Sequence, residues 1–266
     1  MKLPEGLIPA PLRRPAPPGE GNGNGAGTVD RAKEVPADVA GWVDERTGGG
    51  SFLTYVLFRK VPKGTNWFYT LGSATLFAFV FQALTGVFLA MYYTPSPTEA
   101  YGSITHLTND VWLGEFVRGM HKWGATVMII CIFLHMARVF FFGAYKYPRE
   151  LNWVIGVVLL ILTLIMGLTG YLLPFDQRSY WATIVAANIT ATGPILGPYL
   201  ADFLRAGPEI GATTLARFYA IHMLLVPGLI FALIGAHLYL VVKLGTTAPP
   251  WLKGERPKSL RREEVG

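Results

Sequence analysis

Four long apolar runs constrain the fold of this chain more than any other feature of its sequence. Each run is long enough to cross the hydrocarbon core of a membrane, which takes about 20 residues of α-helix. The runs extend from about 67 to 93, 116 to 142, 151 to 174 and 218 to 244. Only 15% of the 266 residues are charged, a share that argues against a soluble globular protein. The sequence therefore predicts an all-α membrane protein, a four-helix bundle with short surface helices between its spans.

The two ends of the chain differ from this apolar centre. Residues 1–50 are rich in Pro and Gly and have little that could form a core, so we expect a disordered N-terminal extension there. A cationic start followed directly by an apolar run is missing, so a cleaved signal peptide is not expected. Residues 51–250 form the expected four-helix domain, and residues 251–266 form a basic tail.

Basic residues flank the predicted helices on one side of the membrane. They are Arg59, Lys60, Lys63, Lys146, Arg149, Lys243, Lys253, Arg256, Lys258, Arg261 and Arg262. The positive-inside rule makes that side cytoplasmic, so both termini are expected in the cytoplasm of a bacterial cell, with the four spans in its inner membrane. The net charge of +6 is then explained by the basic residues on the cytoplasmic side, and nucleic-acid binding is not expected.

Four of the five histidines lie inside predicted spans, where a polar side chain is costly and indicates function. His121 and His135 are 14 residues apart, and His222 and His237 are 15 apart, so each pair lies near one face of its helix about 21–22 Å apart along the axis. The second and fourth helices run in the same direction, which places His121 level with His222 and His135 level with His237. Two imidazoles that face each other at one depth can provide both axial ligands of a haem.

Other roles for the histidines stay open on the pattern alone. A single membrane histidine can form a helix-to-helix hydrogen bond, and a set of them can relay protons, although neither role explains the matched spacing. The difference between 14 and 15 residues also requires an adjustment in the fourth helix. Pro227 lies between the histidines of that helix and would remove one hydrogen bond and kink it.

Glycines and cations accompany the histidines. Gly72 and Gly86 in the first span, and Gly156 and Gly170 in the third, repeat the 14-residue period and would give a bulky macrocycle room against the backbone, although Gly is also a packing residue in membrane helices. The predicted contacts of haem propionates are Arg118, Lys122, Arg138 and Arg149. The one cysteine, Cys131, lies inside the second span and is expected to serve packing.

Longer segments resemble the N-terminal haem-binding half of cytochrome b, in particular the shorter cytochrome b6-type subunit. The resemblance runs from about Trp42 to Pro250. Its blocks are FRKVPKGTNWFYTLGSATL, RGMHKWGATVMIICIFLHMARVF, YKYPRELNWVIG, GLTGYLLPFDQRSYWA and TLARFYAIHMLLVPGLIFALIGAHLYLV. The 15-residue spacing in the fourth helix is the b6-type value.

The resemblance implies a di-haem b subunit of a cytochrome bc-type quinol oxidoreductase. In that family quinol is oxidised at the outer face, one electron goes to a Rieske iron–sulfur protein, and the other crosses two non-covalent b haems to a quinone at the inner face, coupled to proton translocation. His121 and His222 would hold the outer haem iron, and His135 and His237 the inner one. The outer quinol pocket would include Tyr180, Trp181 and Ala182 on a short surface helix, a stretch that could equally be an interfacial aromatic belt.

The resemblance also implies partners and two departures. The expected partners are quinol and quinone, a Rieske protein, a c-type cytochrome, membrane lipid, a second copy of the complex in a homodimer, and a three-helix C-terminal cytochrome b subunit. That last subunit would supply a Pro-Glu-Trp-Tyr motif that this chain lacks, so the chain alone is expected to bind haem without completing the quinol reaction. Thr70 stands where b6-type proteins carry a cysteine that attaches a further haem, so no covalent c-type haem is expected.

Two other classes of protein compete with this interpretation. One is a di-haem membrane anchor of a dehydrogenase or hydrogenase, which passes electrons to quinone without a Rieske protein. The other is a non-redox scaffold or channel, in which the four histidines would have no common role. The block TGYLLPFDQ and the paired spacings of the histidines favour the quinol oxidoreductase subunit.

Overall fold

A computed structural model describes residues 39, 41–42, 44–47 and 62–251, and the chain divides into the units Met1–Arg59 and Lys60–Gly266. In the first unit the described residues are helical, and the Arg46 guanidinium carbon lies 4.2 Å from the centre of the Trp42 ring. The rest of the predicted N-terminal extension lies outside the described residues. The same holds for the basic tail beyond Trp251.

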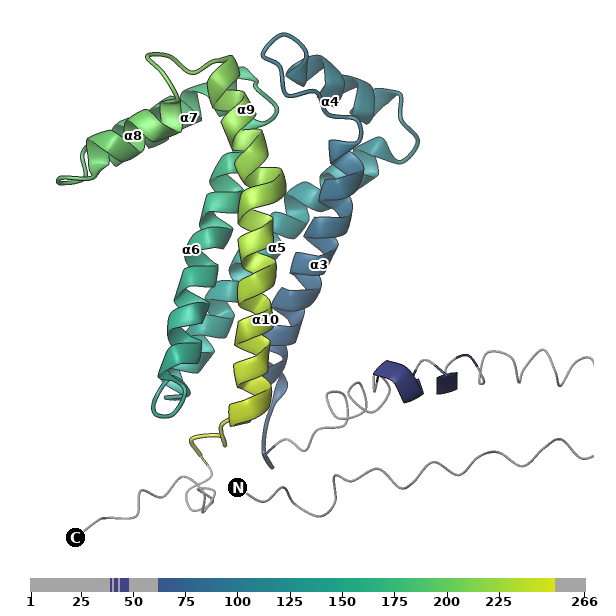
Figure 1. Ribbon diagram of the computed structural model, residues 1–266, viewed down its shortest axis with the longest axis vertical. Helices are drawn as coiled ribbons and strands as arrows, with labels where there is room; N and C mark the ends of the chain where they lie inside the picture. Colours follow the sequence, from purple (N-terminus) through teal and green to yellow (C-terminus); the bar gives the residue numbers. More distant parts are fainter. Residues whose placement is uncertain (1–38, 40, 43, 48–61, 252–266) are drawn as a thin grey trace, which may run out of the picture. The chain divides into compact units, whose positions relative to one another are not determined.

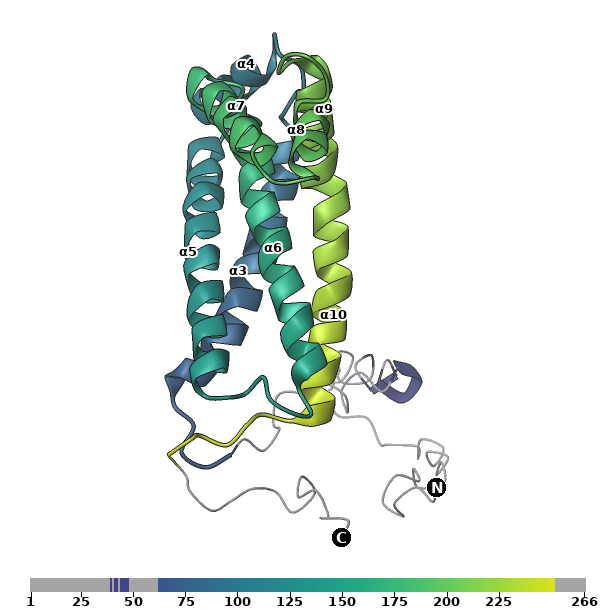
Figure 2. The ribbon, with the colours of Figure 1, turned by 90° about the vertical axis from the view of Figure 1, so that its left-hand side faces the viewer.

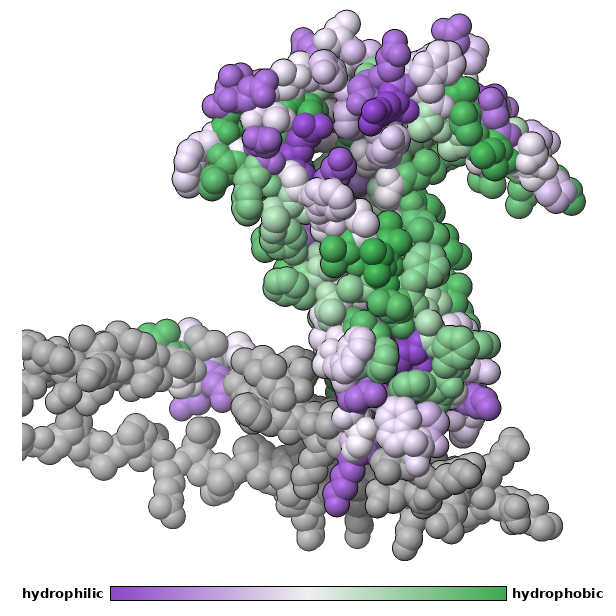
Figure 3. All heavy atoms as spheres, turned by 180° about the vertical axis from the view of Figure 1, so that it is seen from behind, coloured by the Kyte–Doolittle hydropathy of each residue, from purple (hydrophilic) through white to green (hydrophobic). Residues whose placement is uncertain are grey.

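Four helical spans cross the second unit, as the sequence predicted, and make it a multi-pass membrane protein (Figure 1). The first combines η1 (Trp67–Thr70) with α3 (Leu71–Ala90), and the second and third are α5 (Gly114–Phe141) and α6 (Glu150–Leu172). The fourth combines α9 (Ala212–Ala220), η2 (Ile221–Leu225) and α10 (Val226–Leu244). On the face that Figure 3 shows, apolar side chains cover the middle of the bundle and polar ones gather toward its two ends.

The fourth span begins six residues before the predicted position 218. Residues 212–217 carry threonines and an arginine, which a search for apolar runs passes over. The helix nevertheless starts at Ala212, because the backbone N–H of Gly211 donates to the Thr214 hydroxyl at 3.0 Å and Thr214 donates to the Arg205 carbonyl. A polar first turn capped by its own side chain thus extends the helix beyond the apolar core.

Three surface helices lie at the end of the bundle opposite the loop between α5 and α6 (Figure 2). They are α4 (Ala100–Asn109), α7 (Gln177–Ala191) and α8 (Gly197–Arg205). Asp176 caps α7 by accepting the backbone N–H of Ser179 at 2.8 Å. α4 and α9 pack against the end of α6 through an apolar cluster in which Ala100, Leu172 and Leu215 are fully buried. We call this the outer end of the molecule.

The four spans are arranged as two close helix pairs, α3 with α5 and α6 with α10. Between α3 and α5, Gln82 donates to the backbone carbonyl of His121 at 2.9 Å and lies against Gly124, where the absence of a side chain permits the close approach. Phe79, Ile132 and Ile230 belong to a buried cluster that joins the two pairs halfway along the spans. This cluster separates the two depths at which the four histidines lie.

A π-helical turn resolves the mismatch between the 14- and 15-residue spacings. The segment η2 contains His222, and the N–H of Val226 donates to the carbonyl of Ile221, five residues earlier. A π turn holds one residue more than an α turn and occurs mostly at functional sites. Pro227 follows directly at the start of α10, and its nitrogen has no hydrogen to give to an α-type bond. The expected adjustment is therefore a wide turn at His222, with Pro227 at its end.

Candidate functional site

The two outer histidines face each other across the bundle. His121 projects from α5 and His222 from η2, and their ring centroids are 6.4 Å apart with an angle of 72° between the ring planes. Two imidazoles that ligate one metal ion from opposite sides through bonds of about 2 Å have ring centroids roughly 6 Å apart. The observed separation therefore leaves room for one metal ion between the rings.

Hydrogen bonds occupy the Nδ1 atoms of both outer histidines. Thr85 Oγ1 lies 2.9 Å from Nδ1 of His121. Nδ1 of His222 lies 3.2 Å from Thr169 Oγ1 and 3.0 Å from the carbonyl oxygen of Met166. When the Nδ1–H of an imidazole is donated in this way, the Nε2 lone pair is the one available to a metal.

The two threonines that contact the outer histidines were not among the residues predicted from the sequence. Each lies in the tripeptide Leu-Thr-Gly, at positions 84–86 and 168–170. The repeated tripeptide was the available signal, because it places a hydroxyl directly before two of the four glycines that follow the histidine period.

A cavity of about 210 Å³ lies beside the outer histidines, between the two helix pairs. His121 and His222 line it together with Gly86, Gly167 and Pro227, and most of its other walls are aliphatic or aromatic. Pockets of this kind, apolar with a few convergent polar groups, are typical of cofactor sites between the helices of a bundle.

Each of the four predicted glycines lies against one of the four histidines. The pairs are Gly72 with His135, Gly86 with His121, Gly156 with His237 and Gly170 with His222. A Cβ atom at these glycines would lie between 2.6 Å (Gly170) and 3.6 Å (Gly156) from the Cε1 atom of its histidine. The glycines therefore give room to the imidazoles themselves. In the outer layer, the level of His121 and His222, and in the inner layer, the level of His135 and His237, one glycine lies on α3 and the other on α6.

The inner histidines lie farther along the same two spans. His135 is on α5 and His237 on α10, within electrostatic reach of each other. The residues that precede the inner glycines are Leu71 and Ile155, which have no polar side-chain atom. The inner layer thus repeats the arrangement of histidine and glycine without the threonines.

Arg138, one helical turn beyond His135, presents buried donors without an acceptor. Its guanidinium carbon lies 3.7 Å from the centre of the Tyr69 ring and 5.3 Å from that of Phe142. Among the described residues, its Nε and Nη2 atoms are buried and have no hydrogen-bond partner. Buried charged donors are almost always paired, so the site fits an anionic group that the polypeptide does not supply.

The other three predicted cations have different surroundings. Arg118 donates to Thr108 Oγ1 at 3.1 Å on the outer surface, and the Lys122 ammonium lies 5.9 Å from the centre of the Trp123 ring. Arg149 donates from Nε and Nη2 to the carbonyls of Gly245 and Leu244, at 3.3 and 3.0 Å. Arg149 therefore caps the end of α10, where unpaired carbonyls attract a cation.

The three residues predicted for the outer quinol pocket lie on α7. Tyr180 packs against the outer apolar cluster, whereas Trp181 and Ala182 are exposed. Near Tyr180 in the same cluster, the Tyr93 hydroxyl donates to the Leu173 carbonyl at 2.6 Å, and burial raises the pKa of Tyr93. Tyr180 thus faces the bundle, and its two neighbours face away from it.

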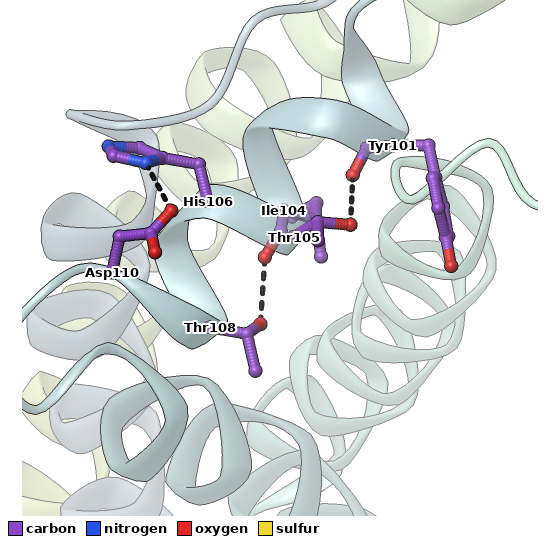
Figure 4. A network of polar contacts seen from close by, with 6 residues as sticks. All are labelled: Tyr101, Ile104, Thr105, His106, Thr108 and Asp110. Atoms are coloured by element: carbon purple, nitrogen blue, oxygen red, sulfur yellow. Dashed lines mark hydrogen bonds and ion pairs between the residues drawn. The ribbon is translucent and has the colours of Figure 1, made fainter.

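The fifth histidine stands apart from the bundle. His106 is exposed on α4, and its Nδ1 atom lies 2.9 Å from Oδ2 of Asp110 (Figure 4). In the part of the chain that the structure describes, no three His, Cys, Asp or Glu side chains gather as a protein-only metal site. A metal bound by the paired histidines would therefore need further ligands from a macrocycle.

Comparison with known proteins decides the family. The sequence model of the family described as cytochrome b/b6/petB matches residues 56–245. The chain belongs to the cytochrome b/b6 family. Membership implies that it binds haem b and works with partner subunits, and it does not favour the anchor of a dehydrogenase or hydrogenase.

Individual relatives of this cytochrome b/b6 chain are similar over most of its length. Cytochrome b6 of Heliobacterium modesticaldum is 43% identical over 210 residues, which cover 78% of this chain and 99% of that protein. The cytochrome b subunit of the menaquinol:cytochrome c reductase of Geobacillus thermodenitrificans is 42% identical over 216 residues, which cover 78% and 96% of the two chains.

A solved structure is similar as well. A chain of a hyperthermophilic respiratory Complex III superposes with a TM-score of 0.74 at 31% identity. The match covers 82% of this cytochrome b/b6 chain and 58% of that chain. The two chains therefore share one helical architecture over the four spans.

Proposed function

We propose that this chain is the di-haem b subunit of a cytochrome bc-type quinol oxidoreductase. The observation that carries the proposal is the separation of 6.4 Å between the outer imidazoles, together with Nδ1 hydrogen bonds that direct both Nε2 atoms toward one metal. When bound, the haems supply one-electron transfer along the bundle, which links quinol oxidation at the outer face to quinone reduction at the inner face and to proton translocation.

His121 and His222 hold the outer haem iron in this proposal, and His135 and His237 the inner one. The second pair rests on the repeated glycine contacts and on the π turn, which brings a 15-residue spacing on the fourth span level with the 14-residue spacing on α5. Both haems are b-type and non-covalent. Thr70 donates its hydroxyl to the Trp67 carbonyl at 2.6 Å and offers no thiol for a thioether bond.

The predicted cations would hold the haem propionates. At the inner layer, the unpartnered donors of Arg138 would bind a propionate, a charge-assisted contact that would stabilise the bound haem. At the outer layer, Arg118 and Lys122 flank His121 and supply the corresponding positive charge. Arg149 holds the end of α10 and remains a predicted propionate contact at the inner end.

The quinol pocket at the outer end includes Tyr180, Trp181 and Ala182. The exposure of Trp181 and Ala182 supports a pocket that is completed by another subunit rather than by this chain. The relative named menaquinol:cytochrome c reductase supports a quinol as the electron donor.

The proposed partners follow from the same relatives, which are named as subunits of larger oxidoreductases. They are a three-helix C-terminal cytochrome b subunit, a Rieske iron–sulfur protein and a c-type cytochrome, assembled as a homodimer in the respiratory chain. The basic residues at the inner end, among them Lys146 and Lys243, support an orientation in the bacterial inner membrane with both termini in the cytoplasm.

Replacement of His222 tests the function in the intact complex. Because His222 pairs with His121, the His222→Ala variant should lose one haem per chain and keep the inner one, as measured by pyridine haemochrome content and by the reduced-minus-oxidised spectrum. Loss of the inner haem alone, or retention of both haems, would contradict the pairing. A purified complex without a Rieske protein would instead point to a simpler quinone-reducing anchor.

A further inference from the structure

Threonine hydroxyls lie beside the Nδ1 atoms of both outer histidines, and the residues at the matching inner positions, Leu71 and Ile155, have no hydroxyl. We propose that Thr85 and Thr169 are positioning residues of the outer haem, whose hydroxyl groups accept the Nδ1–H of the two ligand histidines. Each threonine thereby fixes the tautomer and ring orientation of one ligand and increases the electron donation of that ligand to the iron. The inference rests on the proposed di-haem function and adds a role that distinguishes the two layers.

The other hydrogen bonds of the threonines favour the histidine Nδ1–H as the donor. Thr85 Oγ1 lies 2.8 Å from the carbonyl of Phe81, and Thr169 Oγ1 lies 2.8 Å from the carbonyl of Ile165. A carbonyl can only accept, so the hydroxyl hydrogen of each threonine points to its own helix. The hydroxyl oxygen is then the acceptor for the imidazole Nδ1–H, and Nε2 is left unprotonated for the iron.

The surroundings of the threonines favour a role beyond helix packing. Thr85 and Thr169 are buried, at 9% and 2% exposure, so water does not compete for the imidazole hydrogens. Each precedes a glycine that touches the same histidine to which the threonine is bonded. The Thr-Gly dipeptide therefore holds one imidazole from two sides, through the hydroxyl at Nδ1 and the bare backbone at Cε1.

The two outer ligands depend on their threonines to different degrees. Thr85 Oγ1 lies 2.9 Å from Nδ1 of His121, a closer contact than the 3.2 Å between Thr169 and His222, although the backbone of Gln82 also bonds to the His121 ring. The Nδ1–H of His222 is shared between Thr169 and the Met166 carbonyl, which is the closer of the two. Removal of the Thr85 hydroxyl should therefore perturb the outer haem more than removal of the Thr169 hydroxyl.

Loss of this hydrogen bond should raise the reduction potential of the outer haem. An imidazole that donates its N–H is a more basic ligand and stabilises the ferric state, and loss of such a partner changes metal affinity by about 10- to 100-fold. The ratio of the site's affinity for ferric haem to its affinity for ferrous haem should fall about tenfold in Thr85→Val, which raises the reduction potential of the outer haem by about 59 mV. For Thr169→Val we expect a fall of about threefold, or about 30 mV.

Redox titration of the b-type absorbance in the purified complex tests the proposal. The variants are Thr85→Val, Thr169→Val and the conservative Thr85→Ser, which keeps the hydroxyl. Thr75→Val is the matched control, because Thr75 also lies on α3 and donates to a carbonyl of its own helix, that of Leu71 at 2.9 Å. The ferric low-spin EPR signal of the outer haem, which reports the orientation of the imidazole planes, is recorded on the same samples.

The expected result is an upward shift confined to the outer haem in both valine variants, larger for Thr85→Val, with wild-type behaviour in Thr85→Ser and Thr75→Val. Selective loss of the outer haem in Thr85→Val that Thr85→Ser restores would support the same role. Unchanged potentials and EPR signals in Thr85→Val with both haems bound would overturn it. So would an equal change in Thr85→Ser or in Thr75→Val. A wild-type complex without two b-type haems would instead refute the proposed function.

Discussion

The fourth span has one residue more between its histidines than α5 has, and the π turn at His222 accommodates that residue. Deletion of one residue inside or outside the π turn tests whether this turn sets the register of the two histidines. Fourteen residues of α-helix return to within about 40° of the starting face, whereas fifteen overshoot it by about 60°. Leu224 lies inside η2 and is 77% exposed, so its side chain contributes little to the packing of the bundle. Its deletion should let η2 become an ordinary α turn and leave His222 and His237 separated by 14 residues, the spacing of α5.

The matched control is a deletion of the same length outside the π turn. Ala232 is exposed on α10, in a regular stretch of helix between Pro227 and His237. This stretch has no wide turn that could compensate for a lost residue. Deletion of Ala232 therefore rotates His237 by about 100° and shifts it by about 1.5 Å, which turns the imidazole away from the interior. Both variants have the same number of residues between the histidines and differ only in where the residue is removed.

Haem content per polypeptide and the reduced-minus-oxidised spectrum distinguish the two deletions. The variant that lacks Leu224 should keep two haems, because the wide turn contains the extra residue of the fourth span and can become an α turn without moving His237 out of register. The variant that lacks Ala232 should keep the outer haem and lose the inner one. If the complex without Ala232 kept both haems while the complex without Leu224 lost one, the π turn would not set the register of the ligands.

Three further predictions concern single residues. Gly170→Ala should weaken binding of the outer haem by about tenfold or more, because the new Cβ would lie 2.6 Å from His222 Cε1 and overpacking costs about 1–3 kcal/mol. Gly156→Ala should be tolerated, because its Cβ would lie 3.6 Å from His237 Cε1. Haem retention on dilution measures both, and equal losses would contradict the reasoning. Arg138→Leu should weaken retention of the inner haem by about 10- to 100-fold, since a charge-assisted hydrogen bond contributes about 1.5–3 kcal/mol; unchanged retention would remove Arg138 as a propionate partner. Acid–acetone extraction should leave no haem on the polypeptide, because Thr70 has no thiol; a pyridine haemochrome signal on the extracted chain would reveal a covalent link.

The membrane spans and the histidines were predictable from the sequence because both depend on local properties. Apolar length places a helix in the bilayer, and helical periodicity places His121 and His135 on one face. The predicted start of the fourth span lies six residues after the observed one, because the capping bonds of Thr214, and not apolarity, decide where α9 begins.

The threonines of the outer layer could not be predicted by the same reasoning. A threonine in a membrane helix usually bonds to a carbonyl of its own helix, and Thr85 and Thr169 do so. Their second contacts reach histidines 36 and 53 residues away in the chain, which only the packing of α3 on α5 and of α6 on the fourth span brings together. The π turn was equally hidden, because the spacing required an adjustment without specifying its form.

Potentiometric titration of the wild-type complex tests the central claim most directly. With His121 and His222 on one iron and His135 and His237 on another, the b-type absorbance should titrate in two one-electron steps, with two extractable haems for each copy of this chain. A single step with one haem per chain, or no b-type absorbance, would contradict the account.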